Sequence, residues 1–464
     1  MGNGFAYAVL ALWPLVAIYL YRTRSIQAAT LWTILGGFML LPVKTAVDLP
    51  MIPPMGKHTI PVVSALIGCW FIKNKRISYL QELGKIKYLV ILFITVPFIT
   101  AGLNSAPINI GGRFLPGLTY YDGLSAVVNQ FLIIAPFFIG RQFFKTYEHQ
   151  LLMFKILVVA GLFYSLPMLF EVRMSPQLHT WVYDYFPHSF GQQKRFGGFR
   201  PVVFMGHGLL VSFFAAIVLL SAVALWKSKI KIRNVSSPIV SYYLLVVLVL
   251  CKSIASLFYG VFAFVAIKNI KPKTQHKIAV ALVCLAMLYP TLSIIKIFPH
   301  QTLVNVAESI DASRAQSLQF RFENEDILLS RARERFFFGW GGWGRNRVFN
   351  EQTGKDESVT DGGWIITFGQ FGLLGFIAEF GLLSITVFRA QKASKLLKSK
   401  PEQILLSAHA LLVGIIMVNQ LPNNSLAPWL WLLVGVLCGR VESLFYKDAE
   451  KSSVTAIKNS PVER

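Results

Sequence analysis

Arginine and aspartate side chains in two polar segments are the residues of this sequence best suited to chemistry on phosphates. The segments run from about 171 to 202 and from about 296 to 363. The guanidinium group offers a planar, permanently charged fork that grips phosphate oxygens, and a carboxylate can take a proton from a hydroxyl group. The arginines favour a site that holds a phosphorylated compound. Arg195, Arg200, Arg314, Arg321 and Arg331 lie in these segments, and Asp361 lies at the end of the second.

Each of these side chains also has a purely structural interpretation. Asp361 stands just before a predicted helix, where aspartate is a favoured N-cap, so we expect it to act as a base, as a cap, or as both. The arginines can pair with neighbouring acids and so order the segment around them. Those acids are Glu323, Glu325, Asp326 and Glu334.

The composition of the chain indicates what must position these residues. Of 464 residues, 54% are hydrophobic and 14% are charged, whereas soluble domains carry about 25% charged residues. A large soluble enzyme is therefore excluded, and uncharged runs such as 203–226 are long enough to cross ~30 Å of hydrocarbon. The expected fold is an all-α polytopic membrane protein with about 12–13 transmembrane helices and a long, partly helical outer loop. Spans are predicted near 4–21, 28–43, 59–72, 88–103, 123–140, 151–170, 203–226, 238–251, 254–267, 278–295, 364–388, 403–420 and 425–439.

The loops between the spans alternate in charge, which assigns them to sides. With every second loop placed inside, the inner side holds 26 basic and 7 acidic residues, and the outer side holds 16 and 14. This distribution obeys the positive-inside rule, puts the N-terminus outside, and explains the net charge of +23 without a nucleic-acid partner. Arginine supplies 11 of the 16 basic residues outside but only 7 of the 26 inside. The phosphate site is therefore expected at the outer face.

Two neighbouring inner loops predict an unusual hairpin. Loops 227–237 and 268–277 are both strongly basic, so the apolar stretch between them must cross twice or re-enter, with its break near Lys252-Ser253. Two pieces of about 14 residues are short for full spans, which favours a tight hairpin. The resulting organisation is N-terminal membrane helices (1–170), an outer loop (171–202), central membrane helices (203–295), a large outer catalytic loop (296–363), C-terminal membrane helices (364–440) and a cytoplasmic tail (441–464).

Other polar and aromatic groups have two interpretations each. The run Glu323-Asn324-Glu325-Asp326 carries the oxygen ligands that hard cations prefer, but a solvated helical face paired with arginine is favoured. Trp340 and Trp343 can stack on sugar rings or belong to an interfacial aromatic belt. Glu379 lies inside a span, where an acid is functional by default, or it pairs with Lys252. The spacing of the histidines and cysteines indicates no metal site.

Three stretches follow one another in an order that carries a family resemblance. They are 194–202 (KRFGGFRPV), 313–347 (SRAQSLQFRFENEDILLSRARERFFFGWGGWGRNR) and 359–383 (VTDGGWIITFGQFGLLGFIAEFGLL). They contribute an Arg-Pro entry to a span, an outer loop bearing an arginine, a glycine-rich turn and a G-x-x-G span start (Gly372, Gly375), with the Lys-Ser break between the first two. This order, over residues ~195–385, resembles the O-antigen ligase and O-antigen polymerase superfamily of bacterial membrane glycosyltransferases.

The resemblance implies transfer of a glycan from undecaprenyl diphosphate at the outer face of the bacterial inner membrane, without a metal or other cofactor. It matches Arg321 to the family's loop arginine, and Arg200 or Arg195 to the arginine before the earlier span. The resemblance thus implies Arg200 and Arg321 at the diphosphate, Arg195 in support and Asp361 as the base for an acceptor hydroxyl group, with Arg314 and Arg331 as second choices. Where the family commonly has His-Asn, this chain has Asp361-Gly362, which argues against a histidine-dependent ligase but leaves a carboxylate base. The implied partners are the lipid-linked glycan, the bilayer, and a chain-length regulator or other assembly proteins.

The function expected from this resemblance is a polysaccharide polymerase, whose acceptor is a second lipid-linked repeat unit. An O-antigen ligase to lipid A-core shares the scaffold and stays an alternative. A flippase for lipid-linked oligosaccharides, a different class of protein, would also need a cationic cavity. It predicts ionisable residues throughout the membrane midplane and inverted repeats, whereas the charge of this chain is concentrated in one loop.

Overall fold

The computed structural model of the chain is built almost entirely from helices, which confirms the all-α fold class. It describes residues 2–48, 52–81, 83–195, 197–232, 234–309 and 311–459. Within these residues the α-helices are α1 (Gly4–Thr23), α2 (Ile26–Leu40), α3 (Thr59–Ile67), α4 (Ile86–Leu103), α5 (Tyr120–Phe143), α6 (Tyr147–Met174), α7 (Leu178–Tyr183), α8 (Gly208–Lys227), α9 (Ser237–Leu250), α10 (Ile254–Asn269), α11 (Pro272–Ile294), α12 (His300–Glu308), α13 (Ala312–Arg333), α14 (Gly363–Ala393), α15 (Lys400–Asn419) and α16 (Pro428–Asn459).

Each predicted span coincides with one of these helices. In the described part of the chain, nine helices are long and apolar enough to cross a membrane, so the chain is a multi-pass membrane protein. Four shorter apolar helices occupy the other predicted spans: α2, α9, α10, and α3, which continues through the π-helical turn η1 (Gly68–Ile72). The helices outside the spans, α7, α12 and α13, lie in the two polar segments.

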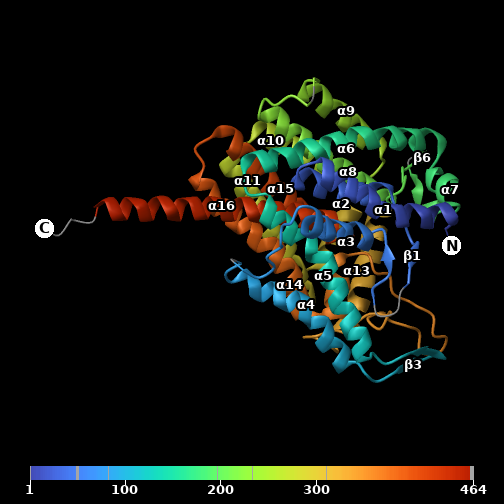
Figure 1. Ribbon diagram of the computed structural model, residues 1–464. Coiled ribbons are helices and arrows are strands. Elements are labelled where there is room, and N and C mark those ends of the chain that lie inside the picture. Colours follow the sequence, from blue (N-terminus) through green and yellow to red (C-terminus); the bar gives the residue numbers. More distant parts are fainter. Residues whose placement is uncertain are drawn as a thin grey trace.

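Helix α8 lies at the core of the bundle because it is apolar around its whole circumference. Of the residues in its apolar stretch, 89% are buried inside the protein, as expected for a helix without a polar face. Helices α6, α9, α10 and α15 pack against it, and Figure 1 shows α6 and α9 alongside. Ser212 and Ser221 donate their hydroxyl groups to the carbonyl oxygens of Gly208 and Ile217, one turn earlier. This local bonding satisfies both hydroxyl donors inside the apolar core.

The loops that the charge pattern assigns to the inside lie at one end of the bundle, and those assigned to the outside lie at the other. At one end, the inner end, Arg141 contacts Glu442 at 2.7 Å. At the other, the outer end, the Asn3 side chain donates to the Val182 carbonyl at 3.1 Å. Figure 1 shows the N-terminus at this outer end, near α7 and away from the end where α16 projects. In both contacts, segments predicted on the same side lie at the same end of the bundle.

Helices α9 and α10 form the predicted hairpin. The chain reverses at Lys252, whose φ is 51°. At the base of the hairpin, at the inner end, the Lys227 ammonium donates to the Lys268 carbonyl at 2.5 Å. At its tip, the Lys252 carbonyl accepts a hydrogen bond from Arg200 at 3.4 Å. The tip therefore meets the first polar segment at the outer end.

Helix α8 begins later than the predicted span at 203. The Glu171 carboxylate on α6 accepts hydrogen bonds from the backbone N–H groups of Val202 and Val203, both at 2.7 Å. Backbone donors held by a side chain are diverted from a helical ladder. In addition, Gly206 has φ of 93°, a conformation that favours glycine. Residues 203–207 therefore form a turn, and the predicted start of this span is wrong.

Helix α14 is broken at Gly372, where the glycine-rich turn of the second polar segment inserts. Gly372 has φ 63° and ψ −165°, a region essentially restricted to glycine. The opened backbone pairs with the turn, since the Trp340 N–H donates to the Gly369 carbonyl (2.9 Å) and the Leu373 N–H donates to the Phe336 carbonyl (2.8 Å). A break in a span is tolerated where such bonds satisfy the freed groups. The two glycine motifs thus dock backbone to backbone.

The described residues include three short antiparallel strand pairs outside the helices, and Figure 1 places β1, β3 and β6 at the outer end. The third pair carries Arg195 and leads into Arg200. The pairs are β1 (Ala46–Val47) with β2 (Met55–Gly56), β3 (Ile108–Ile110) with β4 (Arg113–Leu115), and β5 (Lys194–Arg195) with β6 (Gly198–Phe199).

Candidate functional site

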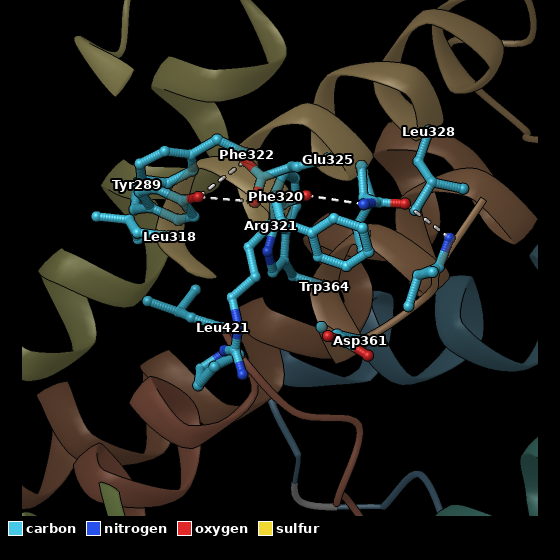
Figure 2. Close-up of a pocket in the computed structure, with 15 residues that line it drawn as sticks. Tyr289, Leu318, Phe320, Arg321, Phe322, Glu325, Leu328, Asp361, Trp364 and Leu421 are labelled. Atoms are coloured by element: carbon cyan, nitrogen blue, oxygen red, sulfur yellow. Dashed lines mark hydrogen bonds between the residues drawn. The ribbon is translucent and has the colours of Figure 1, made fainter. Parts of the chain in front are cut away.

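A cavity of about 200 Å³ opens at the outer end of the bundle, beside α13. Its walls come from α11, α13, the start of α14 and the loop between α15 and α16. Figure 2 shows aromatic side chains, including Tyr289 and Trp364, around a few polar groups. A concave, largely apolar space with a few polar groups is typical of a small-molecule or cofactor site.

Arg321 and Asp361, two of the predicted site residues, line this one cavity. Figure 2 shows the Arg321 side chain running from α13 toward Leu421, with Asp361 below Trp364. Both side chains are exposed, and neither forms a hydrogen bond or ion pair with any described residue. The cap interpretation of Asp361 is wrong, because Gly362 occupies the N-cap position of α14 and no side chain caps that helix. A cation and a carboxylate without protein partners therefore face one cavity.

Asn324 holds the two walls of the cavity together. Its amide donates to the Phe320 carbonyl one turn earlier on α13 (2.7 Å), and its carbonyl oxygen accepts from the Val359 N–H (3.1 Å). Val359 lies two residues before Asp361, so Asn324 fixes the aspartate segment against the helix that carries Arg321. Sequence analysis assigned Asn324 to a solvated face, whereas the side chain is 8% exposed.

Glu325 is a second carboxyl group of this cavity that sequence analysis missed. Its two oxygens accept from the Tyr289 hydroxyl at 2.7 and 2.8 Å, and the His300 ring lies 3.7 Å away. Burial raises the pKa of Glu325 to about 7, and burial also lowers the pKa of His300, which keeps that ring neutral at pH 7. The signal was in the spacing, because Arg321 and Glu325 are four residues apart and share one helical face.

Arg200 and Arg195, the other predicted arginines, lie at the tip of the α9–α10 hairpin rather than in the cavity. Arg200 is 8% exposed, its Nε has no hydrogen-bond partner, and its Nη2 donates to the Lys252 carbonyl at 3.4 Å. Burial and the charge of Arg195 lower the pKa of Arg200. Neither arginine pairs with an acid among the described residues. This cluster therefore favours an anion, which would relieve the repulsion between the charges.

Helix α10 links the arginine cluster to the cavity. Arg321 is close enough to Tyr259 on α10 for its charge to act on the phenol group, and Lys252 at the hairpin tip touches Arg200. Seven residues separate Lys252 from Tyr259, roughly 10 Å at the helical rise of 1.5 Å per residue. Arg200 thus contacts the hairpin directly, whereas Arg321 acts on it only through its charge.

The remaining predicted site residues have different surroundings. Arg331 stacks on Trp340 with 3.4 Å between its guanidinium carbon and the ring centroid, and the Trp340 indole N–H donates to the Arg331 carbonyl at 2.7 Å. Arg331 also contacts Glu334 at 2.7 Å. These two side chains therefore stabilise the loop through each other. Trp343 is 72% exposed, and the side chain of Arg314 lies outside the described residues.

Other outer arginines stabilise the fold through hydrogen bonds and an ion pair. Arg333 donates to the carbonyl oxygens of Ser293 and Ile294 at the end of α11. Arg345 is 2% exposed and donates to two carbonyl oxygens in the loop before α5. Arg347 pairs with Asp356 at 2.5 Å. These arginines therefore have structural roles, whereas the side chains of Arg173, Arg195 and Arg321 form no hydrogen bond or ion pair with a described residue, and of these three Arg321 lines the cavity.

The acidic run at 323–326 does not converge on one point. Glu323 accepts from Gln319 (2.8 Å) on the exposed face, whereas Glu325 points toward Tyr289. Within the described ranges, no group of three or more His, Cys, Asp or Glu side chains could hold a metal ion. Glu379, on α14 beyond the break, accepts a hydrogen bond from Thr367 at 2.6 Å and so bridges the two halves of that helix.

The arrangement combines a cation and two carboxyl groups at a cavity with an arginine cluster nearby. Comparison with known proteins adds no identity, since the chain matches no protein-family model and no curated protein. Chemically, the cationic groups can stabilise a developing phosphate charge, and a carboxylate can accept the proton of a hydroxyl group. These two capabilities are the basis for a functional assignment.

Proposed function

We propose that this chain is a membrane glycosyltransferase that joins an undecaprenyl-diphosphate-linked glycan to an acceptor hydroxyl group. We assign it to the outer face of the bacterial inner membrane, as a polysaccharide polymerase. The observation that carries the proposal is the cavity that Arg321 and Asp361 share without protein partners. The order of motifs over residues ~195–385, which resembles the O-antigen ligase and polymerase superfamily, supplies the substrate class.

The proposed reaction exchanges one bond at the anomeric carbon of the donor sugar. The acceptor oxygen forms a bond to that carbon, and the bond from the carbon to the diphosphate oxygen breaks. The electron pair leaves with undecaprenyl diphosphate, whose added negative charge Arg321 stabilises. The hydroxyl proton passes to the Asp361 carboxylate. Stabilisation of a developing charge by preorganised groups is usually the largest single contribution to the rate of such a reaction, and a positioned base accelerates it further.

A lipid-linked donor can reach this site from the side of the bundle. On α10, Ile254 is 58% exposed and Phe258 is 65% exposed, as expected for a surface that faces hydrocarbon. Arg200 lies at the tip of the same hairpin. We place the lipid tail along α10 and its diphosphate between Arg200 and Arg321, which leaves the sugar for the aromatic cavity.

Reconstitution in liposomes tests the proposal. Purified protein receives an undecaprenyl-diphosphate-linked repeat unit, with and without lipid A-core, and products are sized on a gel. A ladder without lipid A-core indicates a polymerase, and one shifted band that requires lipid A-core indicates the ligase. A parallel tube with EDTA shows whether product formation depends on a divalent metal. No product with any lipid-linked donor would contradict the assignment, and a transport assay then tests a flippase.

Paired variants test the site itself. We expect Arg321→Ala to lower the rate roughly 100- to 1,000-fold, because a preorganised charge stabiliser is lost, and Asp361→Asn roughly 100- to 10,000-fold, because the base is lost. The controls are Arg173→Ala and Asp184→Asn, which remove the same charges from exposed residues outside the cavity. Equal activity in the variants and their controls would exclude this cavity as the site.

A further inference from the structure

A second cavity, of about 740 Å³, lies at the inner end of the bundle, opposite the end that holds Arg321. It is formed by the start of α11, the end of α14, the short 3-10 turn η3 (Ser394–Leu396) and the first turn of α15. Four lysines line it, and none of the described lining residues is Asp or Glu. These lysines are Lys273, Lys277, Lys392 and Lys395.

A buried histidine distinguishes this cavity from an ordinary basic surface. His276 lines the cavity and is 1% exposed, and neither of its ring nitrogens has a hydrogen-bond partner in the structure. Either neutral tautomer of the ring carries one N–H donor. Buried polar groups are normally paired, so this ring lacks a partner that accepts a hydrogen bond. The positive-inside pattern accounts for exposed lysines, but it does not account for an unpaired imidazole among them.

The charge of the cavity is not neutralised by neighbouring acids. Glu402, on the first turn of α15, pairs with Arg440 of α16. Gln403, which lines the cavity, donates to the Leu397 carbonyl at 2.7 Å and is thereby fixed. The four ammonium groups and the imidazole donor therefore remain for an anionic ligand.

We propose that this cavity binds the phosphate group of an anionic lipid from the inner leaflet. The lysines supply the charge, and His276 donates a hydrogen bond to a phosphate oxygen. The cavity lies where the candidate membrane spans α11 and α14 meet the bundle end that the charge pattern assigns to the inside, which is where we expect lipid head groups. Basic pockets between transmembrane helices on the cytoplasmic side are known binding sites for such head groups. This site is independent of the reaction proposed at the outer end.

Native mass spectrometry of the full-length protein tests this site. The protein is titrated with phosphatidylglycerol, with phosphatidylcholine as the zwitterionic comparison and inorganic phosphate as a lipid-free probe. We expect phosphatidylglycerol to bind at least 10-fold more tightly than phosphatidylcholine. Lys392→Gln with Lys395→Gln should weaken it roughly 10- to 30-fold, because two charges at the ligand are lost.

The matched control changes the same charge a few residues away. Lys398→Gln with Lys400→Gln removes two exposed lysines that do not line the cavity, and we expect at most a 3-fold effect. Equal losses in the two double variants would show general surface attraction and overturn the site. His276→Leu should also weaken binding, and unchanged affinity in that variant would overturn the role of the imidazole. Tight binding of inorganic phosphate without preference for phosphatidylglycerol would overturn the lipid as the ligand.

Discussion

Replacing Glu325 by Gln is expected to change how the stability of this protein depends on pH. The Glu325 carboxyl group sits between α11 and α13, bonded to Tyr289, with His300 at 3.7 Å and Asp326 next to it on the same helix. Burial raises its pKa from 4.5 to about 7. The native state therefore favours the protonated form, whereas the unfolded chain ionises near pH 4.5. Glutamine imitates the protonated carboxyl group at every pH.

The size of the effect follows from the pKa difference. Each pKa unit corresponds to about 1.4 kcal/mol, so a rise from 4.5 to about 7 corresponds to about 3 kcal/mol. This stabilisation is fully present below pH 4.5 and is lost as the pH rises to about 7. Burial lowers the pKa of the neighbouring His300, which favours its neutral form and reduces the compensation that this ring can give to the ionised carboxylate.

Thermal unfolding in detergent, followed between pH 4.5 and 8, measures this dependence. The wild-type midpoint should fall with rising pH more steeply than that of Glu325→Gln, and the variant should be the more stable protein at pH 8. Glu323→Gln is the matched control, because Glu323 lies on the exposed face of the same helix. Parallel curves for wild type and Glu325→Gln would refute the buried, protonated carboxyl group.

Three further predictions concern contacts that shape the outer end. Gly372→Ala should lower the unfolding midpoint by several degrees, since a Cβ there would overlap the Phe337 backbone and a non-glycine residue in this conformation costs about 1–3 kcal/mol. The control in the same melting assay is Gly102→Ala, whose added Cβ would contact no other atom. Glu171→Gln should destabilise by about 1–3 kcal/mol, because it leaves buried backbone donors unpaired; chemical denaturation measures this, and a wild-type value would contradict it. Trp340→Ala should cost about 3–5 kcal/mol and Trp343→Ala much less, which thermal melts can compare; equal shifts would disprove the stacking role of Trp340.

The sequence predicted the helices well because their signal is local. Length and apolarity alone place each span, and the basic loops at 227–237 and 268–277 sufficed to predict the α9–α10 hairpin. The start of α8 was missed because its cause is distant: Glu171 on another helix captures the N–H groups of Val202 and Val203. A carboxylate that acts across the bundle leaves no periodic pattern near the residues it holds.

The candidate site was predictable in part, for a different physical reason. Arginine and aspartate could be singled out by type, and the structure places Arg321 and Asp361 at one cavity. Which arginines have protein partners could not be predicted, because Trp340, which stacks on Arg331, belongs to a turn whose backbone pairs with the distant break in α14. Glu325 was assigned with its run to a solvated helical face paired with arginine, although its spacing from Arg321 places it on the cavity face.

The distribution of protein partners among the outer arginines gives the site its physical basis. The two Nη groups of Arg345 donate to backbone carbonyl oxygens, although its Nε, like that of Arg200, has no hydrogen-bond partner among the described residues. Arg321 has no such contacts among the described residues, and Arg200 keeps a buried Nε without a partner. Arg200, which is 8% exposed, gains most from an anionic ligand, because desolvated charges interact more strongly than those in water; the exposed Arg321 contributes a charge at the cavity. For this reason a diphosphate is the ligand class that we expect at this end of the protein.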